Sequence, residues 1–140
     1  MIFLDSSALL PLFVQEEHSS EIEALIRDDP SVVIWWGSTI ECFSTFARLR
    51  RKRIIDSKQE QEIRDWLLEV QRHWTEIQPG NEIKALAHQL LLLHPLSAAD
   101  SMQLAAALLW ADKLPAGHRF VCFDAKLSEA ARTEGFIIAP

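Results

Sequence analysis

Four acidic residues occupy comparable positions along the sequence. Asp5 directly follows the apolar run "MIFL", and Asp124 directly follows "RFVCF". Glu41 and Asp100 lie three residues after a serine, in the segments "STIE" and "SAAD", where helical patterns begin. If the four carboxylates gather at one place, they provide hard oxygen ligands for Mg²⁺ or Mn²⁺. Such a cation supports metal-assisted hydrolysis of a phosphodiester bond.

Each acid also has a structural interpretation. Asp5 and Asp124 fit the N-cap position of a following helix. Glu41 and Asp100 each fit the last position of a capping box that a serine opens. A capping contact of this kind contributes about 1 kcal/mol. Taken one by one, the acids can therefore be explained as helix caps, without a metal-binding or catalytic role.

Taken together, the acids are harder to explain as caps alone. At a separation of about 4 Å and an effective dielectric constant near 20, two like charges repel by about 4 kcal/mol. Protons or a divalent cation must relieve that repulsion when several carboxylates share one cleft. The grouping therefore favours a metal site, with either one ion or two.

The segments around the acids predict an α/β domain with a parallel sheet. Short runs that are apolar at almost every position predict strands covered on both faces. Helical periodicity fills the stretches between them, and strands that alternate with helices imply right-handed crossovers. The carboxyl ends of parallel strands share one edge, where ligands bind in such sheets. The expected strands are residues 1–4, 31–36, 75–79, 119–123 and 136–140.

Four segments in this order resemble the PIN domain, and more narrowly the VapC-type ribonuclease toxins. They are "FLDSSALL", "STIECFSTFARLRRKRII", "HPLSAADSMQLAAAL" and "RFVCFDAKLSEAARTEGFIIAP". The resemblance spans nearly the whole chain. It implies one PIN-like nuclease domain over residues 1–140, with three layers and a central, mainly parallel sheet of four to five strands flanked by helices.

The resemblance also implies an activity and its residues. It implies a Mg²⁺- or Mn²⁺-dependent endoribonuclease that acts as the toxin of a VapBC-type toxin–antitoxin pair. RNA would be its substrate, an antitoxin its protein partner, and a homodimer its assembly. Four acids would hold the metal and carry the catalysis: Asp5, Glu41, Asp100 and Asp124. Three further residues would lie around them, namely the hydroxyls of Ser6 and Ser7, and Cys122, which stands where the family usually has Thr or Ser.

A basic segment follows the predicted Glu41 helix and has two interpretations. It is either a solvated helix end whose cations complement the helix dipole, or an edge that contacts RNA phosphates. The segment consists of Arg48, Arg50, Arg51, Lys52 and Arg53. The neighbouring Trp35 and Trp36 are interpreted as core and rim packing rather than as a platform for bases.

Composition narrows the class of protein. The chain has 140 residues and a net charge of −6, which argues against a surface that binds nucleic acid all over. Its two cysteines, Cys42 and Cys122, lie in apolar stretches, as expected for reduced core cysteines. No signal peptide and no membrane-spanning stretch is predicted, so we expect a cytoplasmic protein.

Pro11 is expected to kink or shorten the helix that begins near Ser6.

Two alternatives to the ribonuclease remain open. A haloacid-dehalogenase-like phosphatase also has an Asp after its first strand, but it needs a second Asp two residues later, where this chain has Ser7. An inactive PIN-like module that binds RNA or protein would keep the fold and lose the metal. The four acids argue against that module, whereas Cys122 favours it.

Overall fold

A five-stranded parallel sheet forms the centre of the computed structural model, which describes residues 1–140. The strand order is β3-β2-β1-β4-β5, so the first strand of the chain lies in the middle. The fold class predicted from the sequence is therefore confirmed, with five strands. The strands are β1 (Ile2–Leu4), β2 (Val32–Trp35), β3 (Thr75–Ile77), β4 (Arg119–Val121) and β5 (Ile137–Ala139).

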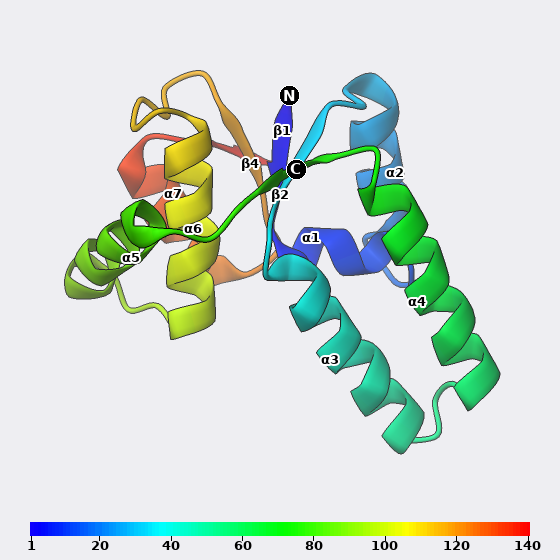
Figure 1. Cartoon of the computed structure of the whole chain (residues 1–140). Helices are drawn as coiled ribbons and strands as arrows, with labels where there is room; N and C mark the ends of the chain where they lie inside the picture. The colour runs from blue at the N-terminus through cyan, green and yellow to red at the C-terminus, as the bar shows by residue number, and fades with distance from the viewer.

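Helices cover both faces of the sheet and give a three-layer arrangement (Figure 1). On one side lie α5 (Asn81–Leu93), α6 (Ala98–Trp110) and α7 (Ala125–Glu134). On the other side lie α1 (Ser6–Leu9), α2 (Ser19–Asp28), α3 (Ser38–Arg51) and α4 (Ser57–Gln71). None of these helices is both long enough and apolar enough to cross a membrane.

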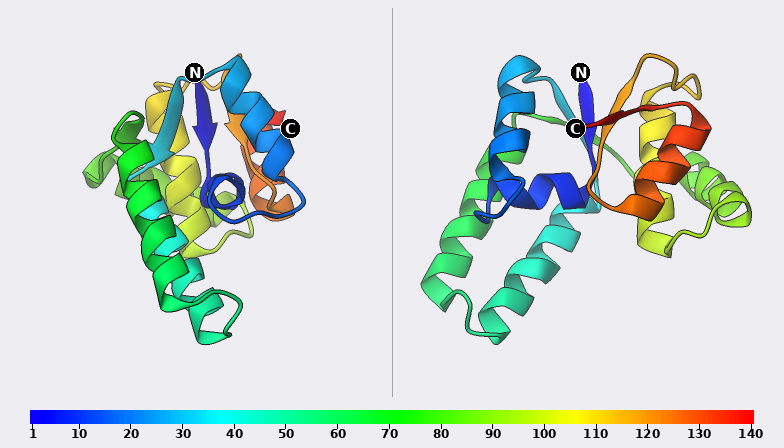
Figure 2. Two further views of the ribbon diagram at one scale, coloured as in Figure 1. Left: turned by 90° about the vertical axis from the view of Figure 1, so that its right-hand side faces the viewer. Right: turned by 180° about the vertical axis from the view of Figure 1, so that it is seen from behind.

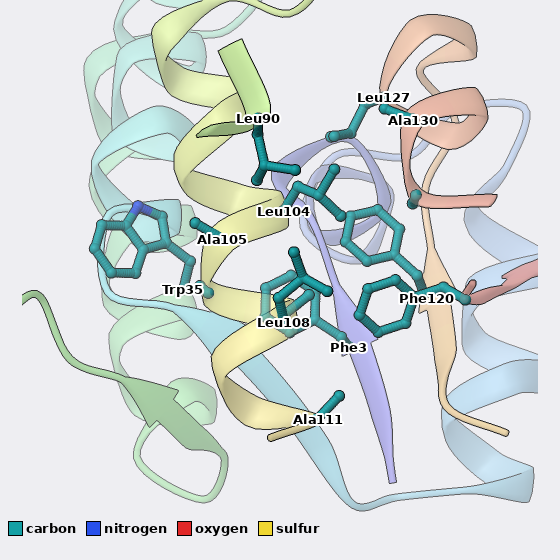
Figure 3. Packing of buried hydrophobic residues seen from close by; sticks show 14 of the residues in the cluster. Phe3, Trp35, Leu90, Leu104, Ala105, Leu108, Ala111, Phe120, Leu127 and Ala130 are labelled. Atoms are coloured by element: carbon teal, nitrogen blue, oxygen red, sulfur yellow. The ribbon is translucent and has the colours of Figure 1, made fainter. Parts of the chain in front are cut away.

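The larger core lies between the sheet and the α5–α7 side (Figure 3). Phe3 of β1 and Phe120 of β4 are fully buried, and their rings stack with centroids 5.3 Å apart. Leu104 and Leu108 of α6 pack against these rings. The Ala-rich sequence of α6 follows from this position, because small side chains let the helix lie close to the sheet.

The alternate residues of the same strands face the α1–α4 side. Ile2 and Leu4 of β1 and Ile34 of β2 form a second core there with Ala8 and Ile22. The central strands β1, β2 and β4 therefore bury both of their faces, which explains why these segments are apolar at almost every position, whereas the edge strand β3 is exposed or half-buried throughout.

Helices α3 and α4 form a hairpin that extends away from the sheet (Figure 2). Where the hairpin joins the body, Cys42 and Phe46 of α3 pack with Leu67 of α4 and Leu9 of α1. Farther along it, the buried Glu60 accepts a 2.8 Å hydrogen bond from Nε of Arg50, which ties the two helices together.

Several local expectations are confirmed. Helix α1 ends at Leu9, and a short 3₁₀ turn containing Pro11 follows over Leu10–Leu12. Cys42 and Cys122 are buried free thiols. The structure also shows that α7 ends at Glu134 and is capped by Gly135, whose φ of 113° is the left-handed conformation that glycine adopts readily at a helix C-terminus.

Candidate active site

Asp5 links the central strand to the first helix. It follows β1 and caps α1, and its Oδ1 accepts the backbone N–H of Ala8 at 3.1 Å. The hydroxyl of Ser7 donates a second hydrogen bond to the same oxygen at 2.7 Å. The N-cap expected from the sequence is therefore confirmed, and the cap itself is buried, since Asp5 is only 2% exposed.

Ser7 and Cys122 connect Asp5 to the end of β4. The Ser7 hydroxyl accepts the backbone N–H of Phe123 at 2.9 Å, and the Cys122 thiol lies 3.4 Å from Oδ2 of Asp5. Burial nevertheless raises the pKa of Asp5 from 3.8 to about 7, although the hydrogen bonds from Ser7, Ala8 and Cys122 act to lower it. Asp5 is therefore a desolvated carboxyl group that exchanges a proton near neutral pH.

Glu41 is held by two other elements. Its Oε2 accepts the hydroxyl of Ser6 at 2.5 Å, and its Oε1 accepts the side-chain amide of Gln103 at 3.1 Å. The capping box expected for this helix is wrong. Helix α3 has Gly37 at its N-cap, so Ser38 is already the first helical residue and no side chain caps the helix.

Gln103 is the residue that sequence reasoning missed. It is fully buried in α6, and its Nε2 donates to Ser38 Oγ at 2.9 Å as well as to Glu41. The available signal was a single amide in an Ala- and Leu-rich helix, three residues after Asp100 and so about one turn away on the same face. Its role is to fix the position of the Glu41 carboxylate.

Asp100 and Asp124 occupy the first turn of α6 and the N-cap of α7. Ser97 caps α6 by accepting the Asp100 N–H at 3.1 Å, which is the serine half of the expected capping box. Asp124 caps α7 as expected, since its Oδ1 accepts the Leu127 N–H at 2.8 Å. The Asp124 N–H is itself directed at the Cys122 sulfur, 3.3 Å away.

Electrostatic coupling joins the acids. The pKa of Asp100 is raised, first by burial and then by the negative charges of Asp124 and Glu41. The structure therefore places the Asp100 carboxyl group within electrostatic range of Glu41 on α3 and Asp124 at the start of α7, while Asp5 lies at the end of β1. Ser6 and Ser7 contact Glu41 and Asp5, respectively.

The donor set suits a hard divalent cation, because carboxylate oxygens are the ligands that Mg²⁺ and Mn²⁺ prefer. The acids are not drawn tightly together, however. No three His, Cys, Asp or Glu side chains lie close enough to form a ready metal-binding group. The carboxylates form an open set, which reduces the repulsion that close contact would create.

The basic segment lies apart from the acids. Helix α3 carries Glu41 in its first turn and Arg51 at its last residue, so about 15 Å of helix separates them. Arg50 is paired with Glu60, and Arg48 donates to the hydroxyl of Thr45. The remaining cations, Arg51, Lys52 and Arg53, are exposed at the tip of the hairpin (Figure 2).

Comparison with known proteins identifies the fold. No protein-family model matches the sequence, and no curated protein matches it by sequence. Solved structures do match. A toxin–antitoxin complex from Klebsiella pneumoniae aligns with a TM-score of 0.63 at 18% identity, covering 90% of this chain and 88% of the other.

Two further structures align with a TM-score of 0.70. FitAcB from Neisseria gonorrhoeae is 14% identical, and the alignment covers 99% of this chain and 96% of that one. VapC20 of Mycobacterium tuberculosis, a sarcin-ricin loop cleaving toxin, is 16% identical, with 98% and 97% covered. At these identities the likeness concerns the fold, and the PIN-like fold expected from the sequence motifs is confirmed.

Proposed function

We propose that this protein is a metal-dependent endoribonuclease. The observation that carries the proposal is the coupling of Asp100 to Asp124 and Glu41 beside the buried Asp5, at the carboxyl edge of a parallel sheet. The negative charges of Asp124 and Glu41, which raise the pKa of Asp100, make the ionised site costly unless a cation binds there. VapC20, which shares this fold, cleaves the sarcin-ricin loop, and its activity supports RNA as the substrate class.

Asp5, Glu41, Asp100 and Asp124 would hold Mg²⁺ or Mn²⁺. When bound, the cation would supply Lewis-acid stabilisation of the phosphate and a more acidic water. The chain's own residues would orient this site. Ser6 and Gln103 fix the two oxygens of Glu41, and Ser7 fixes Oδ1 of Asp5 against the end of β4.

We further propose that the protein is the toxin of a VapBC-type pair, with an antitoxin as its partner and a homodimer as its assembly. The similar Klebsiella structure is a toxin–antitoxin complex, which supports the antitoxin as partner. Exposed apolar side chains, among them Ile40 on α3 and Leu92 and Leu93 on α5, provide surface that a protein partner would bury.

The test is RNA cleavage by the purified protein. A mixed RNA pool is incubated with wild-type protein in Mn²⁺ and in EDTA, and with the Asp5→Asn variant in Mn²⁺. Asparagine keeps the size and the capping oxygen of Asp5 but removes its charge. We expect cleavage only by wild type in Mn²⁺. Equal cleavage in EDTA, or by the variant, would contradict a metal-dependent mechanism.

One observation favours a second candidate, an inactive PIN-like module that binds RNA or protein. The group facing Oδ2 of Asp5 is the thiol of Cys122, and a thiol is a weaker hydrogen-bond donor than a hydroxyl. The same experiment separates the two functions. RNA that is bound but remains uncut in Mn²⁺ would indicate the binding module.

A further inference from the structure

A hydrogen bond between His94 and Glu134 joins two of the elements that carry the acids. His94 is the C-cap of α5, at the start of the connection to α6, and Glu134 is the last residue of α7. Nε2 of His94 lies 2.7 Å from Oε2 of Glu134, and the two side chains are only 9% and 24% exposed. A carboxylate can only accept a hydrogen bond, so Nε2 carries the proton. The bond is therefore short, charge-assisted and partly shielded from water.

This bond is the polar link between α7 and the segment that carries Asp100. No other side-chain hydrogen bond or ion pair joins residues 94–110 to residues 124–134. The rest of the α6–α7 interface is apolar, with Leu104 of α6 in one cluster with Leu127 and Ala130 of α7 (Figure 3). Burial of apolar surface holds the two helices together, but it is non-directional. The His94–Glu134 hydrogen bond is therefore the directional contact between them.

The connection that begins at His94 leads directly to Asp100. Pro95 favours an extended conformation at His94, whose φ and ψ are −133° and 148°. The N–H of Leu96 donates back to the His94 carbonyl at 2.9 Å, and Ser97 then caps α6 by accepting the Asp100 N–H. Local hydrogen bonds therefore link the residue that binds Glu134 to the first turn of α6.

The same connection lies along the start of α7. His94 and Pro95 line one groove with residues of the first two turns of that helix, namely Ala125, Lys126, Glu129 and Ala130. Asp124, the N-cap of α7, directly precedes this stretch. The pKa of Asp100 is raised in part by the charge of Asp124, so the two carboxyl groups lie within electrostatic range. A displacement of the connection along α7 would therefore change the spacing of Asp100 and Asp124.

We propose that His94 is a positioning residue of the candidate metal site, which through Glu134 fixes Asp100 relative to Asp124. The inference rests on the proposed function, because it concerns two of the four acids that would hold the cation. His94 makes no hydrogen bond with either acid. It acts through the placement of α6 on α7, whereas Gln103 holds Glu41 against α6.

The test is Mn²⁺ binding without RNA, measured by electron paramagnetic resonance. His94→Ala and Glu134→Ala each remove the contact, and we expect each to weaken Mn²⁺ binding by roughly 3- to 30-fold, as for other effects transmitted through an intermediate element. The double variant should be no weaker than either single variant, because both remove the same contact. His94→Gln should recover part of the affinity, because its amide can still donate to Glu134.

Amide hydrogen exchange in EDTA adds a readout that needs neither metal nor activity. In His94→Ala the Asp100 N–H, which is bonded to Ser97, should exchange faster because the first turn of α6 opens more often. The Ala8 N–H, which is bonded to Asp5, should exchange as in wild type.

Arg119→Ala is the matched control. Arg119 of β4 forms another partly buried ion pair, at 3.3 Å, with Asp29, and this pair lies at the opposite edge of the sheet. Its removal should leave the affinity for Mn²⁺ unchanged. Urea denaturation measures the stability of every variant, and if His94→Ala does not fold, Glu134→Gln decides in its place, since it keeps the shape of Glu134 and weakens the hydrogen bond.

The outcomes separate the positioning role from the proposed function. Unchanged Mn²⁺ affinity in folded but less stable His94→Ala would show a purely stabilising pair and overturn the proposal, as would additive losses in the double variant. Mn²⁺ binding that depends on His94, without any cleavage of RNA, would uphold the positioning role and refute the ribonuclease. Mn²⁺-dependent cleavage with equal Mn²⁺ affinity in wild type and His94→Ala would do the reverse. Wild type that binds no Mn²⁺ would overturn both.

Discussion

The side-chain amide of Gln103 donates a hydrogen bond of 3.1 Å to the carboxylate of Glu41, across 62 positions of sequence. The same nitrogen donates to Ser38, so Gln103 fastens the first turn of α3 to α6. This contact fixes the orientation of one acid relative to the helix that carries Asp100. Gln103 is therefore a positioning residue of the candidate site.

Replacing Gln103 should disturb both stability and the site. Gln103→Met keeps an unbranched side chain but leaves Ser38 and Glu41 without their donor. Because unpaired buried polar groups are costly, we expect the free energy of unfolding to fall by about 1–3 kcal/mol. Urea denaturation measures this change. Gln89 of α5 is exposed, so Gln89→Met is the control and should change stability by less than about 0.5 kcal/mol.

The raised pKa of Asp5 predicts how stability depends on pH without a cation. The folded protein keeps this proton up to a pKa of about 7, whereas the unfolded chain releases it near 3.8. Between these values the folded state binds more protons, so the free energy of unfolding falls as the pH rises. A shift of this size corresponds to at most about 4 kcal/mol. Urea denaturation in EDTA from pH 4.5 to 8 measures it.

The matched variant for that measurement is Asp5→Asn. It retains the cap on α1 and has no titrating group, so its stability should vary less over the same pH range. A parallel pH dependence in wild type and variant would show that another group titrates, and would refute the assignment to Asp5.

Cys122→Ser should strengthen the contact to Asp5. A hydroxyl donates a stronger hydrogen bond than the thiol now 3.4 Å from Oδ2, and this favours the carboxylate form. We expect the pKa of Asp5 to fall below its value of about 7. Carbon-detected NMR titration of the Asp5 carboxyl measures it.

Cys42→Ser provides the comparison for that variant. Cys42 is buried between α1 and α4 and makes no hydrogen bond with Asp5. Serine there should lower the free energy of unfolding by about 1–3 kcal/mol, because it buries a hydroxyl in an apolar cluster.

An unchanged or higher pKa of Asp5 in Cys122→Ser would contradict the role given to the thiol.

The exposed tip of the α3–α4 hairpin should not affect chemistry at the acids. About 15 Å of helix separates Arg51 from Glu41, which exceeds the Debye length of about 8 Å at physiological salt. Replacing Arg51, Lys52 and Arg53 by Gln should therefore leave the cleavage rate of bound short RNA unchanged. It should reduce the salt dependence of binding only for RNA long enough to reach the tip.

Arg50 provides the contrast within the same basic segment. Arg50 pairs with the buried Glu60, so Arg50→Gln should destabilise the hairpin. The triple variant, in which Gln replaces Arg51, Lys52 and Arg53, should not. A tenfold slower cleavage of short RNA by the stable triple variant would contradict the separation of tip and site.

Local sequence patterns predicted the strands, the caps at Asp5 and Asp124, and the break at Pro11, because each depends on neighbouring residues. The capping box at Glu41 failed because Ser38 is taken into the helix and bonds to Gln103. That contact joins distant segments, so only the fold reveals it. The position of the basic residues relative to the acids likewise depends on the length and direction of α3. The 4% exposure of Trp35 and the 43% exposure of Trp36 depend on which of them β2 buries.

The central claim is that four acids form one cation-dependent site for RNA cleavage. The most direct measurement is Mn²⁺ binding, by electron paramagnetic resonance, to wild type and to Asp5→Asn, Glu41→Gln, Asp100→Asn and Asp124→Asn, with RNA cleavage measured on the same samples. Glu129→Gln, an exposed acid on α7, is the control. We predict that each of the four substitutions weakens Mn²⁺ binding at least about tenfold and abolishes cleavage, as expected for loss of a ligand or its orientation. Mn²⁺ binding that is equal in all the proteins, or cleavage that persists in the four variants, would contradict the account.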